Sequence, residues 1–384
     1  MTPSLDDASI TVTELRGEEA FFGFAEGWRA LFRVTPDPTP FQSFEWLAAW
    51  RRRRGRGEPI LLIANEAGIP IAAMALTQTR YRGAPLRFLR WMGAPDADYH
   101  DFVGGRRRDD CAAAFVGHLR QMPGWHVCEL GELRPQTLAS LASPLSGATQ
   151  DSAPCAALRL PASRDAFERQ AGRKLRSSIR RRAGMLSEAH PDHHFMTVSR
   201  VDELPQAMED LFRLHTARLN KKGYGGAFAT ESARAFHRDV AAAFFENDML
   251  RMHRLMVGDR CIAVIYCFNL RGVTCYYLGG FDPAFSRYSP GVLIIHHAIT
   301  AAIEEGGSWF DFMRGGEEYK SRWKAEPRVN GRLLFGRPGL ASRVAVAARR
   351  FERALWTLWQ SRQGGDAESA AAPETQSSNT PSSA

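Results

Sequence analysis

The fold is decided by residues 273–324, which read VTCYYLGGFDPAFSRYSPGVLIIHHAITAAIEEGGSWFDFMRGGEEYKSRWK. Residues 273–280 are rich in the aromatic and β-branched types that favour strands, and 309–313 form a second apolar run. Between these runs, apolar residues recur at helical spacing from Val292 to Ile303, and the pair Gly306-Gly307 ends that helix. A strand, a loop, a helix and a second strand in this order predict an α/β fold with a mixed sheet.

The start of the expected helix has a composition suited to phosphate. Ser289 is a good cap, Pro290 fits the first helical position, and Gly291 leaves the neighbouring amides unobstructed. Unpaired amides at a helix start bind phosphate, and the guanidinium of Arg287 suits phosphate oxygens. We therefore predict a pyrophosphate site in the loop Arg287, Tyr288, Ser289, Pro290, Gly291 and Val292, with a purely structural helix start as the alternative.

The same order of elements occurs twice along the chain, although the two halves share little sequence identity. Each half has helices, three strands punctuated by turns, one helix and one strand. The first half has strands at 59–64, 69–79, 86–92 and 125–130, with helices at 14–32, 43–54 and 109–121. The second half has strands at 250–257, 261–270, 273–280 and 309–313, with helices at 164–187, 204–219, 230–245 and 290–305.

This order predicts a duplicated architecture, and one continuous α/β domain is the alternative. The predicted units are an N-terminal domain at 1–155, a C-terminal domain at 156–345 and a C-terminal helix at 346–362. Residues 363–384 are rich in Ser, Ala, Pro and Gly without apolar periodicity, so we expect them to be disordered.

Composition excludes several classes of protein. The chain has 384 residues, 44% of them hydrophobic, which suffices for two cores and rules out global disorder. The net charge of +8 suits phosphorylated ligands, nucleic acid or an anionic surface without choosing among them. We expect no membrane-spanning helix, no secretory signal and a cytoplasmic protein. The six cysteines lack zinc-site spacing, so we expect reduced structural thiols and no metal.

The pattern YYLGGFDPAFSRYSPGVLIIHHAI…GG…FDFMRGGEEYKSRW resembles the CelD/BcsL-like acetyltransferase family of the GNAT superfamily, which is associated with cellulose and exopolysaccharide biosynthesis. The resemblance is strongest over residues 211–328 and extends more weakly to FEWLAAW, FLRWMG and DADYHDFV in the first half. The family is related in fold to Fem-type aminoacyl-tRNA transferases, which carry two GNAT-like domains in one chain. The resemblance thus implies tandem GNAT-like acyltransferase domains and acetyl-CoA or another acyl-CoA as co-substrate.

In GNAT enzymes, a loop of the form Q/R-x-x-G-x-G/A after the fourth strand holds the pyrophosphate of the acyl-CoA. Residues 287–292 stand at this place, with one more residue between Arg287 and Gly291 and without a second glycine. Acyl transfer also needs a deprotonated acceptor and stabilisation of the oxyanion, and backbone amides of a splayed strand supply the latter in GNAT folds. The candidate acid–base groups are Tyr276, Tyr277, Asp282, Asp311, Glu317 and Lys320.

Each of the remaining candidates has a structural alternative. Asp311 lies in an apolar strand, where a carboxylate is costly unless it is partnered, for example by Arg314 or Arg322. Lys320 resembles the lysine of the Fem-type Phe-Lys-x-x-Phe segment, which contacts donor or acceptor phosphate; a solvated lysine is the alternative. His215 and Arg218 share one face of a predicted helix, as in a similar His-x-x-Arg helix of the family, and two solvated residues on an amphipathic helix are the alternative.

Two further segments are candidates for binding the substrate. Arg176 belongs to the basic stretch 173–182, which suits an anionic contact but lacks the interleaved aromatics of a nucleic-acid platform. Asp98 and Tyr99 follow a predicted strand, where acidic residues can hold the ammonium group of an acceptor. A solvated helix face and an ordinary acidic loop are the respective alternatives.

Together these features predict an acyl-CoA-dependent N- or O-acyltransferase acting on a small molecule, a saccharide or an exopolysaccharide precursor. The donor is expected in the C-terminal domain and the acceptor between the domains, with the N-terminal domain as a degenerate copy. We expect no stable nucleic-acid partner and no integral membrane contact. A Fem-like transferase using aminoacyl-tRNA and a non-catalytic ligand-binding module are the alternatives.

Overall fold

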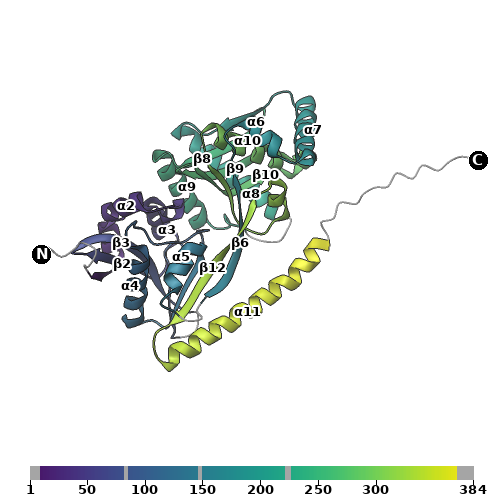
Figure 1. Ribbon diagram of the computed structural model, residues 1–384. Coiled ribbons are helices and arrows are strands. Elements are labelled where there is room, and N and C mark those ends of the chain that lie inside the picture. Colours follow the sequence, from purple (N-terminus) through teal and green to yellow (C-terminus); the bar gives the residue numbers. More distant parts are fainter. Residues whose placement is uncertain (1–8, 82–84, 146–148, 221–225, 370–384) are drawn as a thin grey trace, which may run out of the picture.

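The computed structural model describes residues 9–81, 85–145, 149–220 and 226–369, except for the side chains of 150–151, 218–220 and 356–369 (Figure 1). Of the tail expected to be disordered, residues 370–384 lie outside this description.

Twelve strands form one continuous sheet across the described residues. Neighbouring strands are antiparallel except for two parallel pairs, β4 with β5 and β10 with β11. In spatial order the strands are β1 (Ile10–Arg16), β2 (Glu58–Glu66), β3 (Ile69–Arg80), β4 (Arg87–Trp91), β5 (Val127–Leu133), β12 (Glu326–Gly336), β6 (Thr149–Arg159), β11 (Trp309–Arg314), β10 (Val273–Phe281), β9 (Arg260–Leu270), β8 (Leu250–Val257) and β7 (His193–Thr197).

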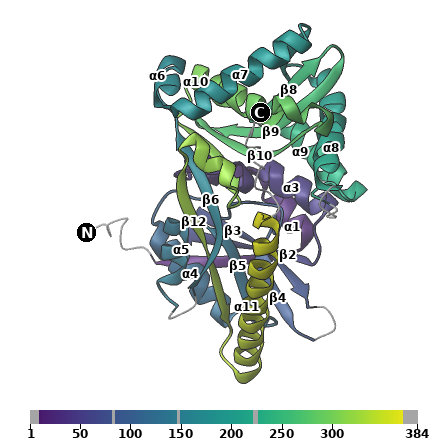
Figure 2. The ribbon, with the colours of Figure 1, turned by 90° about the vertical axis from the view of Figure 1, so that its right-hand side faces the viewer.

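Helices cover both faces of this sheet and build three main apolar cores. One core joins the helices of the two halves, α1 (Gly17–Gly23), α2 (Ala25–Val34), α3 (Phe44–Arg53), α8 (Leu204–Asn220) and α9 (Glu231–Glu246). A second core belongs to the first half, with α4 (Arg108–Gln121) and α5 (Pro135–Ala142). The third belongs to the second half, with α6 (Arg164–Gln170), α7 (Arg173–Ala189) and α10 (Pro290–Glu304). The last helix, α11 (Leu340–Ser369), runs along β12 and β5 (Figure 2).

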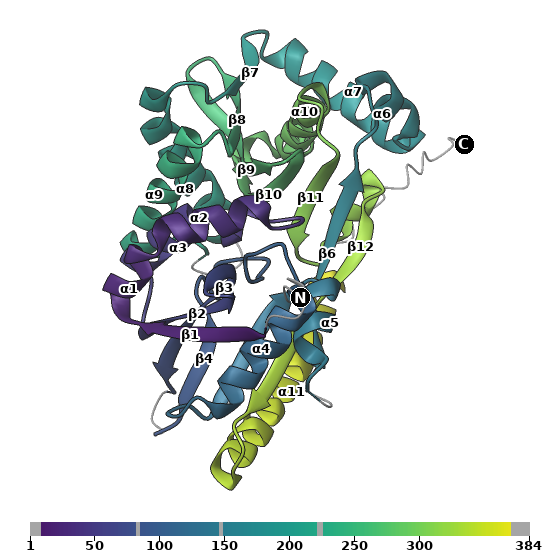
Figure 3. The ribbon, with the colours of Figure 1, turned by 60° about the vertical axis from the view of Figure 1, so that its left-hand side comes forward.

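The duplicated α/β architecture expected from the sequence is confirmed, and the halves exchange their last strands. In each half, a helical segment precedes three antiparallel strands, a helix and a strand parallel to its neighbour. Strand β6 leaves the first half to pair with β11 of the second, whereas β12 returns from the second half to pair with β5 of the first. Figure 3 shows β6 and β12 side by side where the halves meet. The expected boundary at 155/156 falls inside β6.

Several elements differ from the sequence-based expectations. The predicted helix at 14–32 begins at residue 17, because Ile10–Arg16 pair with β2 over seven residues as an edge strand. The predicted helix at 164–187 is divided into α6 and α7 by extended backbone at Ala171 and Gly172. The predicted C-terminal helix lies within α11, which starts six residues earlier than 346, at Leu340. Helix α5 and strands β6, β7 and β12 were not predicted.

The structure also bears on the expectations about the cysteines, metal ligands and membrane-spanning helices. All six cysteines are buried free thiols, and no group of three or more potential metal ligands occurs among the described residues. Within the described ranges, no helix has both the length and the apolar character that crossing a bilayer requires.

Helix α8 approaches β10 so closely that only glycine fits at Gly280. A Cβ atom there would lie 2.4 Å from the backbone nitrogen of His215 and from the carbonyl carbon of Leu214. We expect Gly280→Ala to lower the free energy of unfolding by about 1–3 kcal/mol, because backbone must move. The matched control is Gly117→Ala in α4, where a Cβ meets nothing within 4 Å and alanine should stabilise the helix by about 0.5–1 kcal/mol. Urea unfolding measures the stability of both variants. Equal stability of Gly280→Ala and Gly117→Ala would contradict the close approach of α8 to β10.

Candidate active site

The start of α10 lines a cavity of about 660 Å³ in the second half, which we call the α7–α10 cavity. Its walls come from β9, the end of β10, the first turns of α7 and α10, and the 3₁₀ helix η5 (Glu318–Trp323). Helices α7 and α10 lie side by side on this face of the sheet (Figure 1). Of the predicted pyrophosphate loop, Ser289, Gly291 and Val292 line the cavity.

The tip of α10 has the local geometry that the Ser-Pro-Gly sequence favours. Ser289 caps the helix with a left-handed backbone (φ 49°, ψ 56°), and its hydroxyl makes no capping hydrogen bond. Pro290 has no N–H, and the Val292 N–H donates to the Ser289 carbonyl at 2.9 Å. Gly291 therefore supplies the amide at the tip, with the ring of Phe281 lying 3.3 Å from the position of a Cβ.

The other three residues of the predicted loop, Arg287, Tyr288 and Pro290, do not line the cavity but pack next to the tip of α10. The guanidinium of Arg287 stacks on the Tyr288 ring at 4.5 Å and donates to the Tyr288 hydroxyl. Tyr288 and Pro290 are buried, whereas Arg287 is exposed. Arg182 of α7 donates to the Arg287 carbonyl at 3.2 Å, which ties α7 to this loop.

Helix α7 brings positive charge to the cavity. Lys174, Ser178 and Arg182 line it, spaced along one side of the helix. Arg176, the predicted substrate-binding residue of this segment, is half-buried and lies outside the lining. The basic stretch 173–182 thus adjoins the cavity through residues other than the one proposed from the sequence.

Strands β10 and β11 separate next to this cavity. Their parallel pairing covers only Val273–Cys275 against Trp309–Asp311, after which β10 continues to Phe281 with a bulge at Tyr277. Tyr276 lines the α7–α10 cavity, while Tyr277 packs in the core shared by the two halves. The end of β10 therefore contacts the cavity through Tyr276 and the core at the boundary between the halves through Tyr277.

On that boundary, two candidates from distant parts of the sequence meet. The Tyr99 hydroxyl donates to the Asp311 carboxylate at 3.0 Å, and the Met313 N–H donates to it at 2.7 Å. Burial raises the pKa of Asp311 despite these two hydrogen bonds. Burial, together with the neighbouring Asp311 charge, also raises the pKa of Tyr99 well above its usual value. A buried carboxylate of raised pKa in contact with a phenol is suited to general acid–base chemistry.

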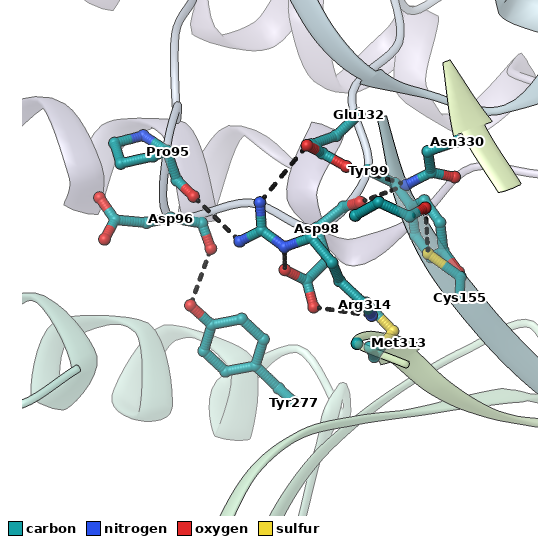
Figure 4. Close-up of polar contacts among 12 residues, drawn as sticks. Pro95, Asp96, Asp98, Tyr99, Glu132, Cys155, Tyr277, Met313, Arg314 and Asn330 are labelled. Carbon is teal, nitrogen blue, oxygen red and sulfur yellow. Dashed lines mark hydrogen bonds and ion pairs between the residues drawn. The ribbon is translucent and has the colours of Figure 1, made fainter. Parts of the chain in front are cut away.

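Asp98 lies beside this pair and is held by an arginine of β11 (Figure 4). The Arg314 guanidinium is 3.0 Å from the Asp98 carboxylate and 3.6 Å from Glu132. Asn330 of β12 donates to the Asp98 carbonyl at 3.1 Å. Arg314, which the sequence suggested as a partner for Asp311, thus pairs with Asp98 instead, and the nearest cation to Asp311 is Arg328 at 4.0 Å.

His215 and Tyr277 lie on the same side of β10 as these residues. The Tyr277 hydroxyl donates to the Asp96 carbonyl at 2.8 Å (Figure 4). The His215 ring packs edge-on against Phe228 at 4.9 Å. The side chain of Arg218 lies outside the described residues.

Lys320 is buried, and three backbone carbonyls surround its ammonium group. Its Nζ donates to Met313, Arg314 and Gly315 at 3.2, 3.1 and 3.0 Å. It also forms a 2.9 Å ion pair with Glu317, whose side chain is 52% exposed. This geometry ties η5 to the end of β11 and leaves the ammonium group no direction toward a ligand.

We expect Lys320→Met to act mainly on stability. A buried acceptor left without a partner costs about 1–3 kcal/mol, and this variant leaves three, so the loss should reach at least about 2 kcal/mol in urea unfolding. Glu317→Gln, which removes only the exposed partner, should cost less than about 1 kcal/mol. A Lys320→Met variant as stable as the wild type but without activity would instead indicate contact with a ligand.

Several residues of this region are not among the site residues expected from the sequence. Glu132 and Asn330 complete the cluster around Arg314, but Asn330 lies on a strand that was not predicted and Glu132 directly follows a predicted one. Tyr319, Arg322 and Trp323 wall the α7–α10 cavity. All three belong to the segment EEYKSRW, from which Glu317 and Lys320 were expected to be catalytic and Arg322 only to pair with Asp311. Arg322 lines the cavity instead.

Comparisons with known proteins relate part of the chain to a protein family. Residues 173–321 match the family model described as Acetyltransferase (GNAT) domain. No curated protein matches the chain in sequence. Residues 173–321 thus resemble a GNAT acetyltransferase domain, and this match supports an acyltransferase.

Solved structures share the fold at low sequence identity. FemX is 9% identical with a TM-score of 0.58, and the match covers 83% of this chain and 96% of FemX. The C-terminal DUF2156 domain of a putative lysylphosphatidylglycerol synthetase from Agrobacterium fabrum is 15% identical with a TM-score of 0.55, covering 85% of this chain and 96% of that domain. A conserved protein of unknown function from Bacteroides thetaiotaomicron is 11% identical with a TM-score of 0.54, covering 81% and 96%. These likenesses concern the fold alone.

Proposed function

We propose that the protein transfers an acyl group from acetyl-CoA or another acyl-CoA to an amine or hydroxyl of a small molecule or saccharide, such as an exopolysaccharide precursor. The observation that carries this proposal is that the tip of α10 lines a large cavity beside the point where β10 and β11 separate. A phosphate-binding helix start next to a gap in the sheet suits a donor that has a diphosphate at one end and a thioester at the other.

In this proposal each part of the donor has a partner. The diphosphate accepts from the Gly291 amide, and the cationic side chains of Lys174 and Arg182 neutralise its phosphates. The acyl group extends past Tyr276 into the gap between β10 and β11. Asp311 takes the proton of the acceptor as the C–N or C–O bond forms, the C–S bond breaks, and the proton ends on the CoA sulfur. Backbone amides of the diverging strand stabilise the oxyanion.

Among the described residues of the first half, the loop that corresponds to the tip of α10 is tightly packed, which supports the proposed role of this half as a degenerate copy. Helix α4 begins after Arg107, whose left-handed backbone (φ 46°) matches that of Ser289. A Cβ at Gly104 or Gly105 would lie 2.3 Å from a backbone carbonyl oxygen of β3 or α2, respectively, so this loop is packed closed. Arg107 is engaged with Glu66 at 2.8 Å.

A thermal-shift series with CoA, acetyl-CoA and longer acyl-CoAs tests the donor. A donor that binds only the folded state raises the melting temperature, and the stabilisation grows with the logarithm of the donor concentration once that concentration exceeds the Kd. We expect stabilisation by CoA and its thioesters, and release of free CoA thiol once a suitable acceptor is supplied. Absence of any shift with CoA and with every thioester would contradict the proposal.

A second candidate keeps the fold but uses an aminoacyl-tRNA as the donor. The exposed basic residues of α7 beside the cavity, with Arg173 and Arg180 on its outer surface, favour it. About six phosphate contacts would weaken binding roughly 10³-fold between 50 and 200 mM salt, whereas a CoA thioester should lose far less. Activity that collapses over this range, without stabilisation by CoA, would favour the tRNA donor.

A further inference from the structure

A second cavity, of about 280 Å³, lies where the halves meet, and we call it the arginine cavity. It opens where β4 and β5 separate, just past their last parallel pair, Arg90 and Glu129. Strand β12 contributes Arg332, β11 contributes Arg314, and α11 contributes Arg349 and Arg353. None of its lining residues lines the α7–α10 cavity.

Positive charge exceeds negative charge in this lining, which holds five arginines and two glutamates. The buried Glu129 carboxylate alone meets four guanidinium groups, those of Arg90 at 3.0 Å, Arg332 at 3.1 Å, Arg349 at 3.0 Å and Arg353 at 2.8 Å. Glu132 also lies 3.5 Å from Arg332, and Glu352 lies 2.8 Å from Arg349, so four cations share three carboxylates. Burial and the charge of Arg353 accordingly lower the pKa of Arg332 below its ordinary value.

The lining also contains buried nitrogen atoms without partners. Nε2 of His100 and Nε of Arg332 are buried and make no hydrogen bond within the described residues. His100 is 4% exposed and its ring stacks on Trp91 at 5.8 Å. Buried polar atoms of native proteins are normally hydrogen-bonded, so two orphans at one cationic cavity indicate a missing partner.

We propose that the arginine cavity binds a small oxyanion, namely phosphate or the phosphate group of a small monoester. Guanidinium groups bind phosphate oxygens through paired, charge-assisted hydrogen bonds. An anion would offset the positive charge that remains after Glu129, Glu132, the Asp98 partner of Arg314 and the Glu352 partner of Arg349 are counted. Because the size of the cavity is at the low end for ligand sites, the ligand is a phosphate or a compact phosphate ester. This inference does not depend on the identity of the acyl donor.

Titration calorimetry on the full chain, with inorganic phosphate and separately with glucose 6-phosphate, tests the site. The wild-type protein should bind at least one of these probes, and the stronger binder distinguishes free phosphate from a monoester. Arg353→Gln should weaken binding about tenfold or more, because a hydrogen bond between charged groups contributes about 1.5–3 kcal/mol. Arg90→Gln is the second variant should the first fail to fold.

Arg343→Gln is the matched control, because Arg343 is an exposed arginine of the same helix outside the lining. It should leave binding unchanged, whereas Gly291→Asp at the tip of α10 should remove only such phosphate as binds at the donor site. The proposal is overturned if neither probe binds, if Arg343→Gln weakens binding as much as Arg353→Gln, or if only Gly291→Asp abolishes it.

Discussion

Gly291→Asp is expected to weaken acyl-CoA binding at least about a hundredfold while the protein stays folded. A carboxylate near a helix start is compatible with the helix dipole, so α10 should still form. The same carboxylate would stand at the amide proposed to hold the diphosphate, and two like charges at short distance in a partly enclosed cavity repel strongly. Calorimetry with acetyl-CoA measures the change in Kd.

The charge effect is separated from the steric effect by Gly291→Asn. Asparagine has nearly the size of aspartate and meets the same Phe281 ring, 3.3 Å from the position of the Cβ, but it carries no charge. We expect Gly291→Asn to weaken binding clearly less than Gly291→Asp. Unchanged acetyl-CoA affinity in Gly291→Asp would remove the donor site from this part of the molecule.

Asp311→Asn is expected to lower kcat by about 10²–10⁴-fold, the usual contribution of a positioned general base. The amide keeps an oxygen that can accept from Tyr99 and from the Met313 N–H, so the local hydrogen bonds survive the change. Because Asp311 does not line the α7–α10 cavity, the Kd of acetyl-CoA should stay the same. Steady-state kinetics together with donor calorimetry provides both quantities.

The pH dependence of the rate gives an independent test of the same residue. A general base acts in its ionised form, and burial raises the pKa of Asp311. The rate should therefore fall as the pH drops through this raised pKa, at a pH above the value of about 3.9 that is typical of an exposed aspartate. Tyr99→Phe, which removes one hydrogen bond to the ionised carboxylate, should move this limb to higher pH. Full activity of Asp311→Asn would exclude it as the base.

The fold was predictable wherever its signal was local. The apolar runs of β2, β3, β8, β9 and β10, with their turn residues, indicated the two meanders. Strands β6 and β12 were missed because each contains proline, and β12 also has the Asn330-Gly331 pair that normally marks a turn. These two strands carry the exchange between the halves, which depends on pairing partners far away in the sequence.

The candidate site was likewise predictable where its residues are consecutive and not where they come from distant parts of the sequence. The tip of α10 followed from the consecutive residues Ser289, Pro290 and Gly291. Tyr99 and Asp311 were both selected by their chemistry, but their contact spans 212 residues, and no local pattern contains it. Lys320 was chosen for its resemblance to a phosphate-contacting lysine, whereas its three carbonyl partners depend on the path of the chain after β11.

A structure of the protein with CoA bound tests the central claim most directly. The account predicts CoA in the α7–α10 cavity, with a diphosphate oxygen within hydrogen-bond distance of the Gly291 amide, roughly 2.7–3.2 Å, and the thiol directed toward the gap between β10 and β11. CoA bound elsewhere on the chain, or an empty cavity at saturating CoA, would contradict it.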